Sequence, residues 1–406
     1  MRLKDFSKLN PAYQGDLLET EVSFVPMESL RYGKIDYQEI PFSEAKGKYT
    51  FFANGDLLIA KVTPCFENGN IAITNGLKEG IGFGSSEIFV LRMDKRVLNT
   101  YMFYVVQTSR FQDAACATMC GVGGLKRISP LFMRTYELNV PGLFDQHKIV
   151  DYLDEKTSAI DARIKLLEKK KDAYTRLKKA MINRAVTRGL DEHVKLKDSG
   201  VEWIGMIPEC WEVKRIKELC PFVSRGATPN YDDDGEYKVM NQAVFSTGKL
   251  NHKVVRYSSY MKPDSQIKKG DLLIASTGGG VLGKLYFFDD EDTDFYADTH
   301  VTIVRNDRGS FYVKFLFYLL SYQFDMINVC MAKGSTNQTE LQRDSLLSYE
   351  LAVPPIEEQQ AIIAFLDDKC SKIDAAIANI DKQTDALKRL KRSLINEVIT
   401  GKRIIE

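Results

Sequence analysis

Hydrophobic residues recur every seven positions in two long stretches of this chain, and each stretch lacks glycine and proline inside the pattern. In the first stretch they stand at Leu153, Ile160, Leu167, Tyr174 and Met181, and in the second at Leu366, Ile373, Ile380, Leu387 and Leu394. Further apolar positions beside them widen each stripe to one face of a helix. The spacing predicts two long amphipathic helices, each with a coiled-coil seam.

The two stretches are copies of one another. The segment that begins at Val140 returns without a gap at Val353, 213 positions later, with many identical residues. Prolines stand just before each predicted helix, where they cannot break it, and Gly189 and Gly401 stand near the ends. Because each helix follows a globular stretch, which we call a head, the duplication predicts two heads with an internal pseudo-twofold repeat.

Charge along each predicted helix is ordered, with acids early and bases late. The first copy opens with acids such as Asp151 and Asp161 and ends in bases such as Lys178, and the second runs from Glu357 to Lys391 and Arg392. A solvated charged face would explain any single charge, but the matched order in both copies favours an antiparallel pair with acids beside bases. About 45 helical residues span roughly 65 Å, so the pair is predicted to act as a spacer.

The heads repeat more weakly, but they stay in phase. Gly55–Ala60 matches Gly270–Ala275, whereas Gly121–Ser129 and Gly334–Gln342 correspond in place and differ in sequence. Shared strands with divergent loops predict one scaffold carrying two different sets of ligand contacts. We expect strands at residues 56–62, 88–92, 271–276, 285–288 and 301–305, and helices at 100–117 and 312–331.

The predicted fold class is therefore α+β, with two mixed α/β heads separated by two long helices that form an antiparallel coiled coil. The predicted division is a first head at 1–143, a first spacer helix at 144–189, a second head at 190–355 and a second spacer helix at 356–403. A segment at 197–213, which has no counterpart before Met1, holds Trp203 and Trp211. We expect it to pack the second head against the end of the helical pair.

Composition narrows the class of protein. The 406 residues include 44% hydrophobic and 27% charged residues, with 56 Lys and Arg against 55 Asp and Glu, which argues against a simple non-specific nucleic-acid binder. No apolar run is long enough to cross a bilayer, and the N-terminus has no secretory h-region. The seven cysteines contain no CxxC pair, so we expect buried thiols in a reducing cytoplasm and no metal site.

The candidate catalytic motifs in the sequence are incomplete. Gly278–Lys284 has the glycine spacing of a phosphate-binding loop, but Leu285 stands where a Ser or Thr would bind magnesium, and a strand-like run follows. This segment is interpreted as a glycine-rich hairpin. The four histidines are scattered, and no amino-methyltransferase motif occurs, so we expect no catalysis by the chain alone.

Three features together resemble the specificity subunit of type I DNA restriction-modification systems. They are Leu351–Gln359 (LAVPPIEEQ), Ser199–Val213 (SGVEWIGMIPECWEV) and the duplicated helix with its Leu-Asp and Lys-Ile-Asp elements. The resemblance covers essentially the whole chain. It implies that each head is a target recognition domain for one half of a split double-stranded DNA sequence, and that the helices set the unread spacer. The first head lacks a copy of the tryptophan-bearing segment, so contacts at its end of the helices are expected to differ or to involve the C-terminal tail.

The resemblance also implies partners and cofactors. Two modification (methyltransferase) subunits would dock on the helices, and restriction/translocase subunits would join the complex. S-adenosylmethionine, ATP and magnesium are expected on those partner subunits and none on this chain, which is expected to be non-catalytic, cytoplasmic and without a membrane partner. The alternative is a coiled-coil interaction scaffold without sequence-specific DNA binding, and a self-contained methyltransferase or nuclease is disfavoured by the missing motifs.

Base recognition in a major groove needs Arg or Lys for guanine, Asn or Gln for adenine, and Thr or aliphatic groups for the thymine methyl. Residues of these types stand in the loops between shared strands, and some of them would contact only phosphate. The candidates in the first head are Lys61, Thr63, Asn68, Asn70, Lys126 and Arg127. Those in the second head are Arg225, Asn241, Gln242, Thr277, Lys284, Ser335, Thr336, Asn337 and Gln338.

Overall fold

The structure is a computed structural model, and its contacts group the chain into two compact units. It describes residues 1–15, 20–121, 124–278, 280–291, 294–323, 331–333 and 339–405. Unit 1 combines Met1–Glu168 with Ile380–Glu406, and unit 2 is Lys169–Asn379. Each unit therefore holds one head together with part of both long helices.

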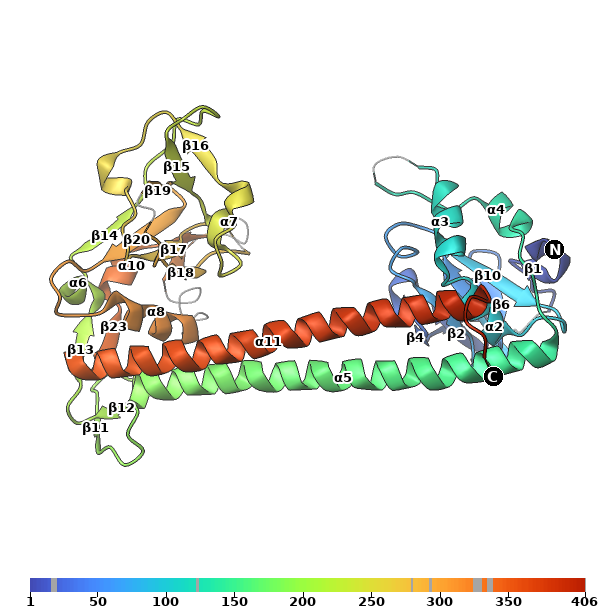
Figure 1. Cartoon of the computed structure of the whole chain (residues 1–406), viewed down its shortest axis with the longest axis horizontal. Coiled ribbons are helices and arrows are strands. Elements are labelled where there is room, and N and C mark those ends of the chain that lie inside the picture. Colours follow the sequence, from blue (N-terminus) through green and yellow to red (C-terminus); the bar gives the residue numbers. More distant parts are fainter. Residues whose placement is uncertain are drawn as a thin grey trace. The chain divides into compact units, whose positions relative to one another are not determined.

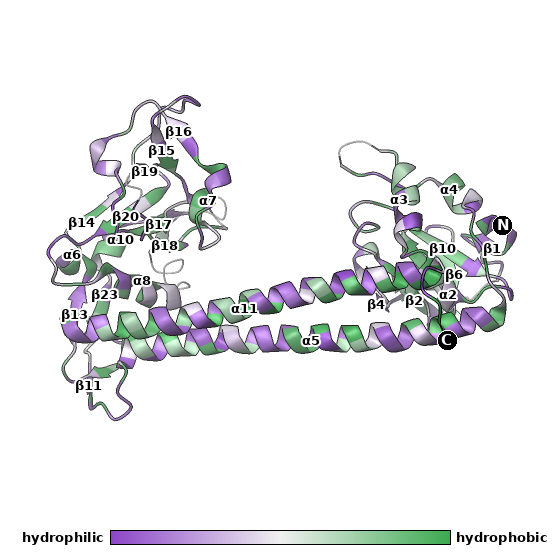
Figure 2. Cartoon of the chain, in the orientation of Figure 1, coloured by the Kyte–Doolittle hydropathy of each residue, from purple (hydrophilic) through white to green (hydrophobic). Residues whose placement is uncertain are grey.

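The two long helices are α5 (Leu143–Arg188) and α11 (Ile356–Ile399) (Figure 1). Hydrophobic and hydrophilic residues alternate along both of them, as the seven-residue pattern requires (Figure 2). Gly189 and Gly401 follow their ends with φ of +74° and +71°, the left-handed conformation in which helices commonly terminate. The prolines and glycines of the sequence thus mark both ends of each helix.

The helices pair antiparallel within each unit. In unit 1, Asp161 from the early part of α5 bonds Lys391 from the late part of α11 at 2.6 Å. In unit 2, Asp374 from the early part of α11 bonds Lys178 from the late part of α5 at 2.7 Å. Asp374 lies 213 positions after Asp161, and Lys391 lies 213 positions after Lys178, so the two pairs are equivalent in the repeat. The prediction of acids beside bases in an antiparallel pair is confirmed.

The first head contains two four-stranded sheets. In hydrogen-bonded order, one sheet is β1 (Ser7–Leu9), β10 (Ile88–Met93), β7 (Leu57–Ala60) and β8 (Ile71–Ile73), and the other is β5 (Gln38–Pro41), β2 (Glu21–Val25), β9 (Ile81–Gly84) and β6 (Thr50–Ala53). The pair β2–β9 is parallel, and the other neighbours are antiparallel. A short hairpin joins β3 (Leu30–Arg31) to β4 (Lys34–Ile35), and the helices are α1 (Phe42–Ala45), α2 (Asn99–Val105), α3 (Ser109–Ala117) and α4 (Pro130–Thr135).

The second head repeats the first of these sheets. The order β14 (Phe222–Arg225), β20 (Val301–Arg305), β17 (Leu272–Ala275) and β18 (Leu285–Phe287) matches β1, β10, β7 and β8. Its second sheet has three strands, β16 (Arg256–Ser258), β15 (Tyr237–Met240) and β19 (Phe295–Ala297), with a parallel β15–β19 pair. Two-stranded pairs are β11 (Leu196–Asp198) with β12 (Met206–Pro208), β13 (Glu212–Arg215) with β23 (Glu350–Val353), and β21 (Ala332–Lys333) with β22 (Glu340–Leu341). Among its described residues the short α-helices are α6 (Ile216–Leu219), α7 (Gln242–Phe245), α8 (Val313–Tyr322) and α10 (Arg343–Ser348).

The central strands explain why the heads fold alike. All four residues of β7 are buried, and so are those of β17. Since successive side chains of a strand point to opposite faces, each strand contributes residues to two hydrophobic cores. Leu57 and Ile59 of β7 enter one core, and Leu58 and Ala60 enter another. β17 divides in the same way between its own two cores.

The predicted strands are confirmed, while one predicted helix is divided. The stretch 100–117 forms α2 and α3, because Thr108 caps a new helix by accepting a hydrogen bond from the backbone N–H of Phe111. The stretch predicted at 312–331 is helical as α8 up to Tyr322, and residues 324–330 lie outside the described part of the chain. The glycine-rich segment joins two antiparallel strands, β17 and β18, so the hairpin interpretation is confirmed.

Trp211 packs the second head against α11, as predicted. Its ring is fully buried against Phe315, and its indole N–H donates to Glu358 of α11 at 3.0 Å. Trp203 is half exposed and stacks on Tyr349. In unit 1 the tail residue Ile405 joins a cluster with Leu153 of α5 and Leu394 of α11, and Met1 contacts Leu138 through its amino group.

The cysteines differ from the prediction of buried thiols. Cys220 and Cys370 are buried, whereas Cys120 and Cys210 are exposed because they lie in surface loops. Cys330 lies outside the described residues. Among the residues that the structure describes, no helix combines the length and hydrophobicity that crossing a membrane requires, and no cluster of three metal-ligating side chains occurs.

Candidate nucleic-acid interface

In the first head, three chain segments meet where β7 ends and β10 begins, and we call this place edge 1. The backbone N–H of Lys61 donates to the carbonyl of Glu87 at 3.0 Å, and the carbonyl of Lys61 accepts from the N–H of Ile128 at 2.9 Å. The N–H of Thr63 donates to the carbonyl of Lys126 at 2.9 Å. Edge 1 therefore holds together three segments that are far apart in the sequence.

The second head builds the same place, edge 2, where β17 ends and β20 begins. The N–H of Ser276 donates to the carbonyl of His300 at 2.8 Å, and the carbonyl of Ser276 accepts from the N–H of Leu341 at 2.9 Å. The N–H of Gly278 donates to the carbonyl of Thr339 at 3.2 Å. Each backbone bond of edge 1 has its counterpart here, so the two edges share one backbone framework.

The side chains of edge 1 are dominated by an ion pair. Arg127 holds Glu87 through Nη2–Oε1 at 2.9 Å and Nε–Oε2 at 3.0 Å. This bond lowers the pKa of Glu87 despite the opposing effect of burial. The Lys61 ammonium lies 5.5 Å from the centre of the Phe89 ring and adds a second positive charge beside Glu87. Edge 1 therefore presents a cation-rich cluster with one carboxylate that organises it.

The side chains of edge 2 have different chemistry. Thr277 Oγ1 lies 2.7 Å from Nδ1 of His300, whose backbone N–H donates to Asp298 at 2.8 Å. Asp298 is buried, and burial raises its pKa. Arg225 contacts Glu340 at 3.3 Å on the neighbouring segment. An imidazole, a hydroxyl and an Arg–Glu pair thus occupy the place that Arg127, Lys61 and Glu87 occupy in the first head.

Equivalent positions in the two edges carry opposite or unrelated groups. His300 follows Glu87 by 213 positions, and Glu340 follows Arg127 by the same offset. Residue types predict Arg127 as a candidate but do not point to Glu87, His300 or Glu340, whose side chains the structure places at the edges. The repeat contained the signal that could have identified them, because they stand beside shared strands at matched positions whose residue types differ.

The structure brings several predicted residues together and separates others from the edges. Lys61, Lys126 and Arg127 lie at edge 1, and Arg225 and Thr277 lie at edge 2. Gln242 lies next to edge 2, because its side-chain nitrogen is 3.5 Å from the position that a Cβ would occupy on Gly278. Lys284 lies in the turn after β17, where its carbonyl accepts from the N–H of Ala275. Ser335, Thr336, Asn337 and Gln338 lie outside the described residues.

Three further candidates make bonds that maintain the fold. Thr63 donates to the carbonyl of Gly124 at 2.8 Å and accepts from the N–H of Lys126, so its hydroxyl joins two loops. Asn241 caps α7 by accepting from the N–H of Ala243 at 2.9 Å. Asn70 is buried between β7 and its neighbouring turn.

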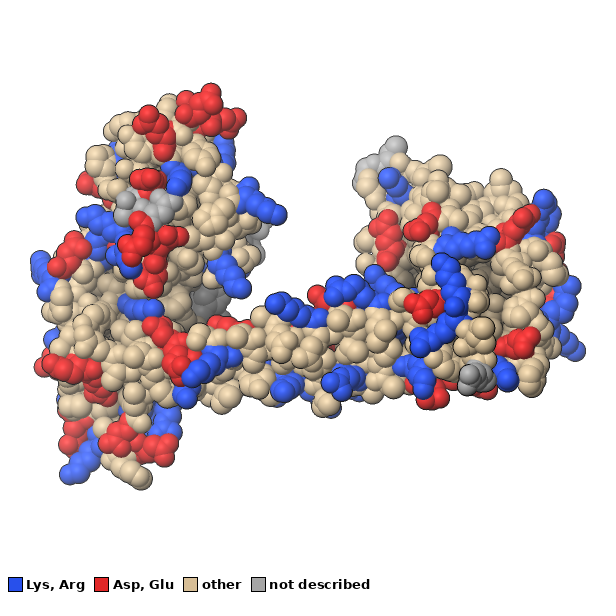
Figure 3. All heavy atoms as spheres, in the orientation of Figure 1, with Lys and Arg blue, Asp and Glu red and all other residues tan. Residues whose placement is uncertain are grey.

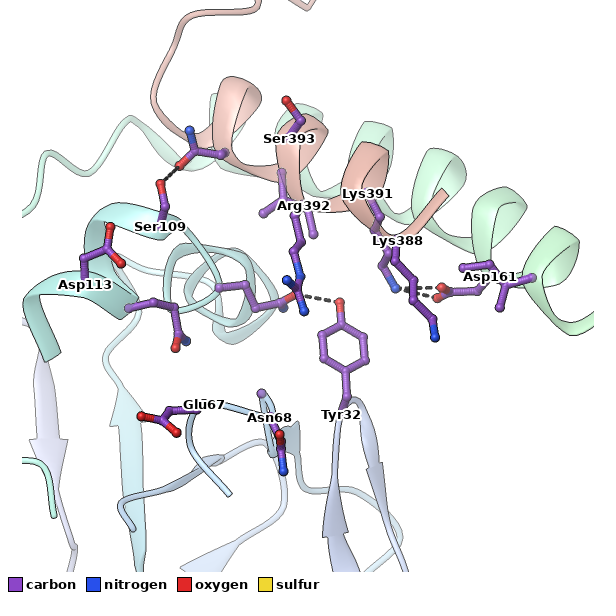
Figure 4. Close-up of a pocket in the computed structure, with 16 residues that line it drawn as sticks. Tyr32, Glu67, Asn68, Ser109, Asp113, Asp161, Lys388, Lys391, Arg392 and Ser393 are labelled. Atoms are coloured by element: carbon purple, nitrogen blue, oxygen red, sulfur yellow. Dashed lines mark hydrogen bonds and ion pairs between the residues drawn. The ribbon is translucent and has the colours of Figure 1, made fainter. Parts of the chain in front are cut away.

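Asn68 faces a separate cleft inside unit 1, between the first head and the long helices (Figure 4). The cleft has a volume of about 680 Å³. Arg392 and Lys388 of α11 line one wall, and Glu67 and Asp113 of the head line another. Walls of opposite charge suit an occupant that carries both positive and negative or polar groups.

Comparisons with known proteins agree with this architecture. Residues 208–388 match the family described as "Type I restriction modification DNA specificity domain". The specificity subunit of the type I restriction enzyme EcoAI from Escherichia coli is 33% identical over 181 residues, which cover 41% of this chain and 31% of that protein. The EcoEI specificity subunit is similar in the same way, so the chain matches about a third of the length of these two relatives. The MjaVIII specificity subunit from Methanocaldococcus jannaschii is 24% identical, over 79% of this chain and 74% of that protein.

Solved structures share the fold. A chain from a study of complex assembly and conformational transition in a type I R-M system aligns over 98% of this chain and 96% of its own, with a TM-score of 0.75 and 16% identity. The HsdS subunit from Thermoanaerobacter tengcongensis aligns over 99% of this chain and 96% of its own, with a TM-score of 0.53 and 17% identity. These likenesses show that the chain shares their fold. Residues 208–388, less than half of the chain, are similar to the DNA specificity domain of type I restriction-modification systems, and the relatives named above are specificity subunits of type I restriction enzymes.

Proposed function

We propose that this chain selects the DNA sequence for a type I restriction-modification complex, with each head reading one half of a bipartite target. The single observation that carries the proposal is the pair of edges, in which one backbone framework appears twice with different side chains. Two equal frameworks suit the same task performed twice, and different side chains suit two different half-sites. Direct base contacts are assigned to Arg127 and Lys61 at edge 1 and to Thr277, His300 and Arg225 at edge 2.

The paired helices α5 and α11 are proposed to set the unread spacer and to dock two modification subunits, with restriction/translocase subunits completing the complex. Methylation and cleavage then belong to those partners, which act in the cytoplasm and bind S-adenosylmethionine, ATP and magnesium. We expect no nucleotide phosphate at the glycine-rich segment, since strand β18 follows it, whereas a phosphate loop leads into a helix N-terminus. The chain contributes recognition to the assembly.

Balanced charge is consistent with a shared DNA interface. Acidic and basic side chains are interspersed over both units (Figure 3), and the formal net charge is +1. A protein that bound DNA alone would gain most of its affinity from phosphate contacts made by clustered cations. We propose that the modification subunits supply much of that phosphate contact, while the edges supply base contacts.

Selection from a random-sequence DNA library tests the function. The chain, assembled with its modification subunits, should enrich one bipartite motif with two different half-sites and a constant spacer. Modification subunits without the chain are the control and should enrich no motif. Failure of the complex to enrich any bipartite motif would overturn the proposal and favour the alternative of an interaction scaffold.

A matched deletion tests the spacer. Removing one heptad from α5 and the equivalent heptad from α11 preserves the seam, because both helices keep the seven-residue pattern. The spacer should shorten while both half-sites remain the same. Changed half-sites with an unchanged spacer would contradict the role assigned to the helices.

A further inference from the structure

Each head is fastened to its own long helix by a buried glutamine. In unit 1 this residue is Gln146, the fourth residue of α5, which is fully buried. Its side-chain oxygen accepts from the backbone N–H of Leu98 at 2.8 Å, at the start of α2. Its side-chain nitrogen donates to the carbonyls of Arg96 and Pro141, both at 2.9 Å. One carboxamide thus joins a loop of the head, the start of α2 and the start of α5.

Unit 2 contains the same arrangement. Gln359, the fourth residue of α11, is 1% exposed. Its oxygen accepts from the N–H of Tyr312 at 2.9 Å, at the start of α8, and its nitrogen donates to the carbonyl of Pro354 at 2.9 Å. Gln146 and Gln359 are separated by 213 positions, so both copies of the repeat keep the residue and two of its bonds, one to the start of the head's helix and one to the proline before the long helix.

A second bond lies farther along each helix. Tyr104 of α2 donates its phenolic proton to Asp154 of α5 at 2.5 Å, and Tyr318 of α8 donates to Asp367 of α11 at 2.6 Å. Burial, helped by the neighbouring carboxylate, raises the pKa of both phenols, so both remain proton donors at neutral pH. Lys314 of α8 also contacts Asp367 at 2.8 Å, which strengthens the attachment in unit 2.

Two attachment points restrict motion that one point would allow. Eight residues separate Gln146 from Asp154, which corresponds to about 12 Å along a helix. A helix held at two such points can neither slide along its neighbour nor rotate on it without breaking a buried polar bond. A buried polar group that loses its partner is costly, so the two bonds favour one placement of the head over neighbouring placements.

We propose that Gln146 with Tyr104–Asp154, and Gln359 with Tyr318–Asp367, form two latches that hold each head in one register on its helix and so select a single DNA spacer length. These are positioning residues, since the bonds described above join none of them to edge 1 or edge 2 and they act through the placement of the edges. The inference rests on the proposed function, because a spacer has meaning only for a bipartite target.

The test compares latch variants with a matched control in the assembled complex. Tyr318→Phe removes only the hydroxyl, and Gln359→Met removes the carboxamide at similar volume. Tyr322→Phe makes the same chemical change on an exposed tyrosine at the end of the same helix α8. Selection from a library that carries the wild-type half-sites with variable spacers should give, for both latch variants, about a fivefold rise in sequences whose spacer departs by one base pair. The control variant should retain the wild-type spacer, and base preferences within both half-sites should be unchanged in all variants.

The outcomes separate the latch from the proposed function. If the wild-type complex enriches no bipartite motif, the proposed function fails and the latch fails with it. If the wild type selects one spacer and both variants select the same spacer equally sharply, the latch alone is overturned. A change of base preference in the second half-site would also overturn it, since the residues would then act on recognition itself. Tyr104→Phe provides a second variant in unit 1 should Gln359→Met prevent folding, with the same broadening expected.

Discussion

Each unit contains an Asp–Arg ion pair at the equivalent place in its central sheet, but the two pairs differ in their exposure to solvent. The comparison shows which features the repeat preserves. Asp271 bonds Arg305 at 2.6 Å in unit 2, and Asp56 bonds Arg92 at 2.6 Å in unit 1. The Arg305 side chain is 10% exposed, whereas the Arg92 side chain is 36% exposed. Both arginines join the central sheet strand to the turn before its neighbour, so the bond preserves the scaffold even where the surrounding packing has changed.

At the edges, in contrast to the ion pairs, the side chains are not preserved between the two heads. Their backbone bonds are the same in both heads, while their side chains differ at matched positions such as Glu87 and His300. The scaffold therefore accepts two different sets of side chains on the same backbone bonds. Residues that contact the ligand can therefore differ at the edges while the fold stays the same.

The largest expected effect is the difference in lost stability between variants of the two Asp–Arg pairs. Arg305→Met leaves Asp271 buried without its partner and should lower the free energy of unfolding of unit 2 by ~3–5 kcal/mol. Burial raises the pKa of Asp271 even with Arg305 bonded to it, which shows how costly its isolated charge would be. Arg92→Met should lower the free energy of unfolding of unit 1 by only ~1–3 kcal/mol, because water reaches that site more readily.

Urea unfolding can be followed separately in the two units. Both tryptophans of the chain, Trp203 and Trp211, belong to unit 2, so their fluorescence reports that unit. Amide hydrogen exchange in β7 and β10 reports unit 1. Equal losses in the two units would show that exposure of the arginine does not control the strength of this bond.

The next effect tests whether the edges act independently. His300→Ala should weaken discrimination at bases of one half-site by ~1–3 kcal/mol and leave the other half-site unchanged. Glu87→Ala should alter only the opposite half-site, since it releases Arg127 at edge 1. Library selection with each variant complex gives both base preferences at once. A variant that altered both half-sites equally would contradict independent reading by the two heads.

A smaller effect compares the two cross-helix ion pairs. Asp161→Asn should cost ~0.5–1 kcal/mol and Asp374→Asn ~0.2–0.5 kcal/mol, with both losses decreasing at high salt. The difference is expected because the Lys391 side chain is 12% exposed and the Lys178 side chain is 30% exposed. Thermal unfolding at low and high salt measures both. Equal and salt-independent losses would argue against a charge contribution to helix pairing.

The smallest effect concerns pH at edge 1. The bond from Arg127 lowers the pKa of Glu87 in the folded protein, so its stabilisation is present above the unfolded-state pKa and is lost as the pH falls through the folded-state value. Glu87→Gln should cost roughly 0.2–0.5 kcal/mol at pH 7, because the pair is partly exposed to solvent. The difference in Tm between wild type and variant should shrink and disappear as the pH falls through the lowered pKa of Glu87. A difference that grew in acid would reverse the assigned direction.

Local patterns in the sequence determined a large part of this protein. The seven-residue spacing and the flanking Pro and Gly residues predicted both long helices, since helix periodicity and helix ends depend on neighbouring residues. The order of charges predicted the antiparallel pairing, and the matched strands predicted a repeated scaffold. These predictions needed only residues close in sequence or related by the internal repeat.

Tertiary structure alone decided which side chains share a site. Lys61, Glu87 and Arg127 come from three separate segments, and only the pairing of β7 with β10 and the adjoining loops brings them together. It also shows that Thr63 and Asn241, predicted as DNA contacts, make side-chain bonds within the protein, and that Asn70 is buried. Contacts between distant segments depend on which surfaces the cores bury together, and that is a property of the whole folded unit.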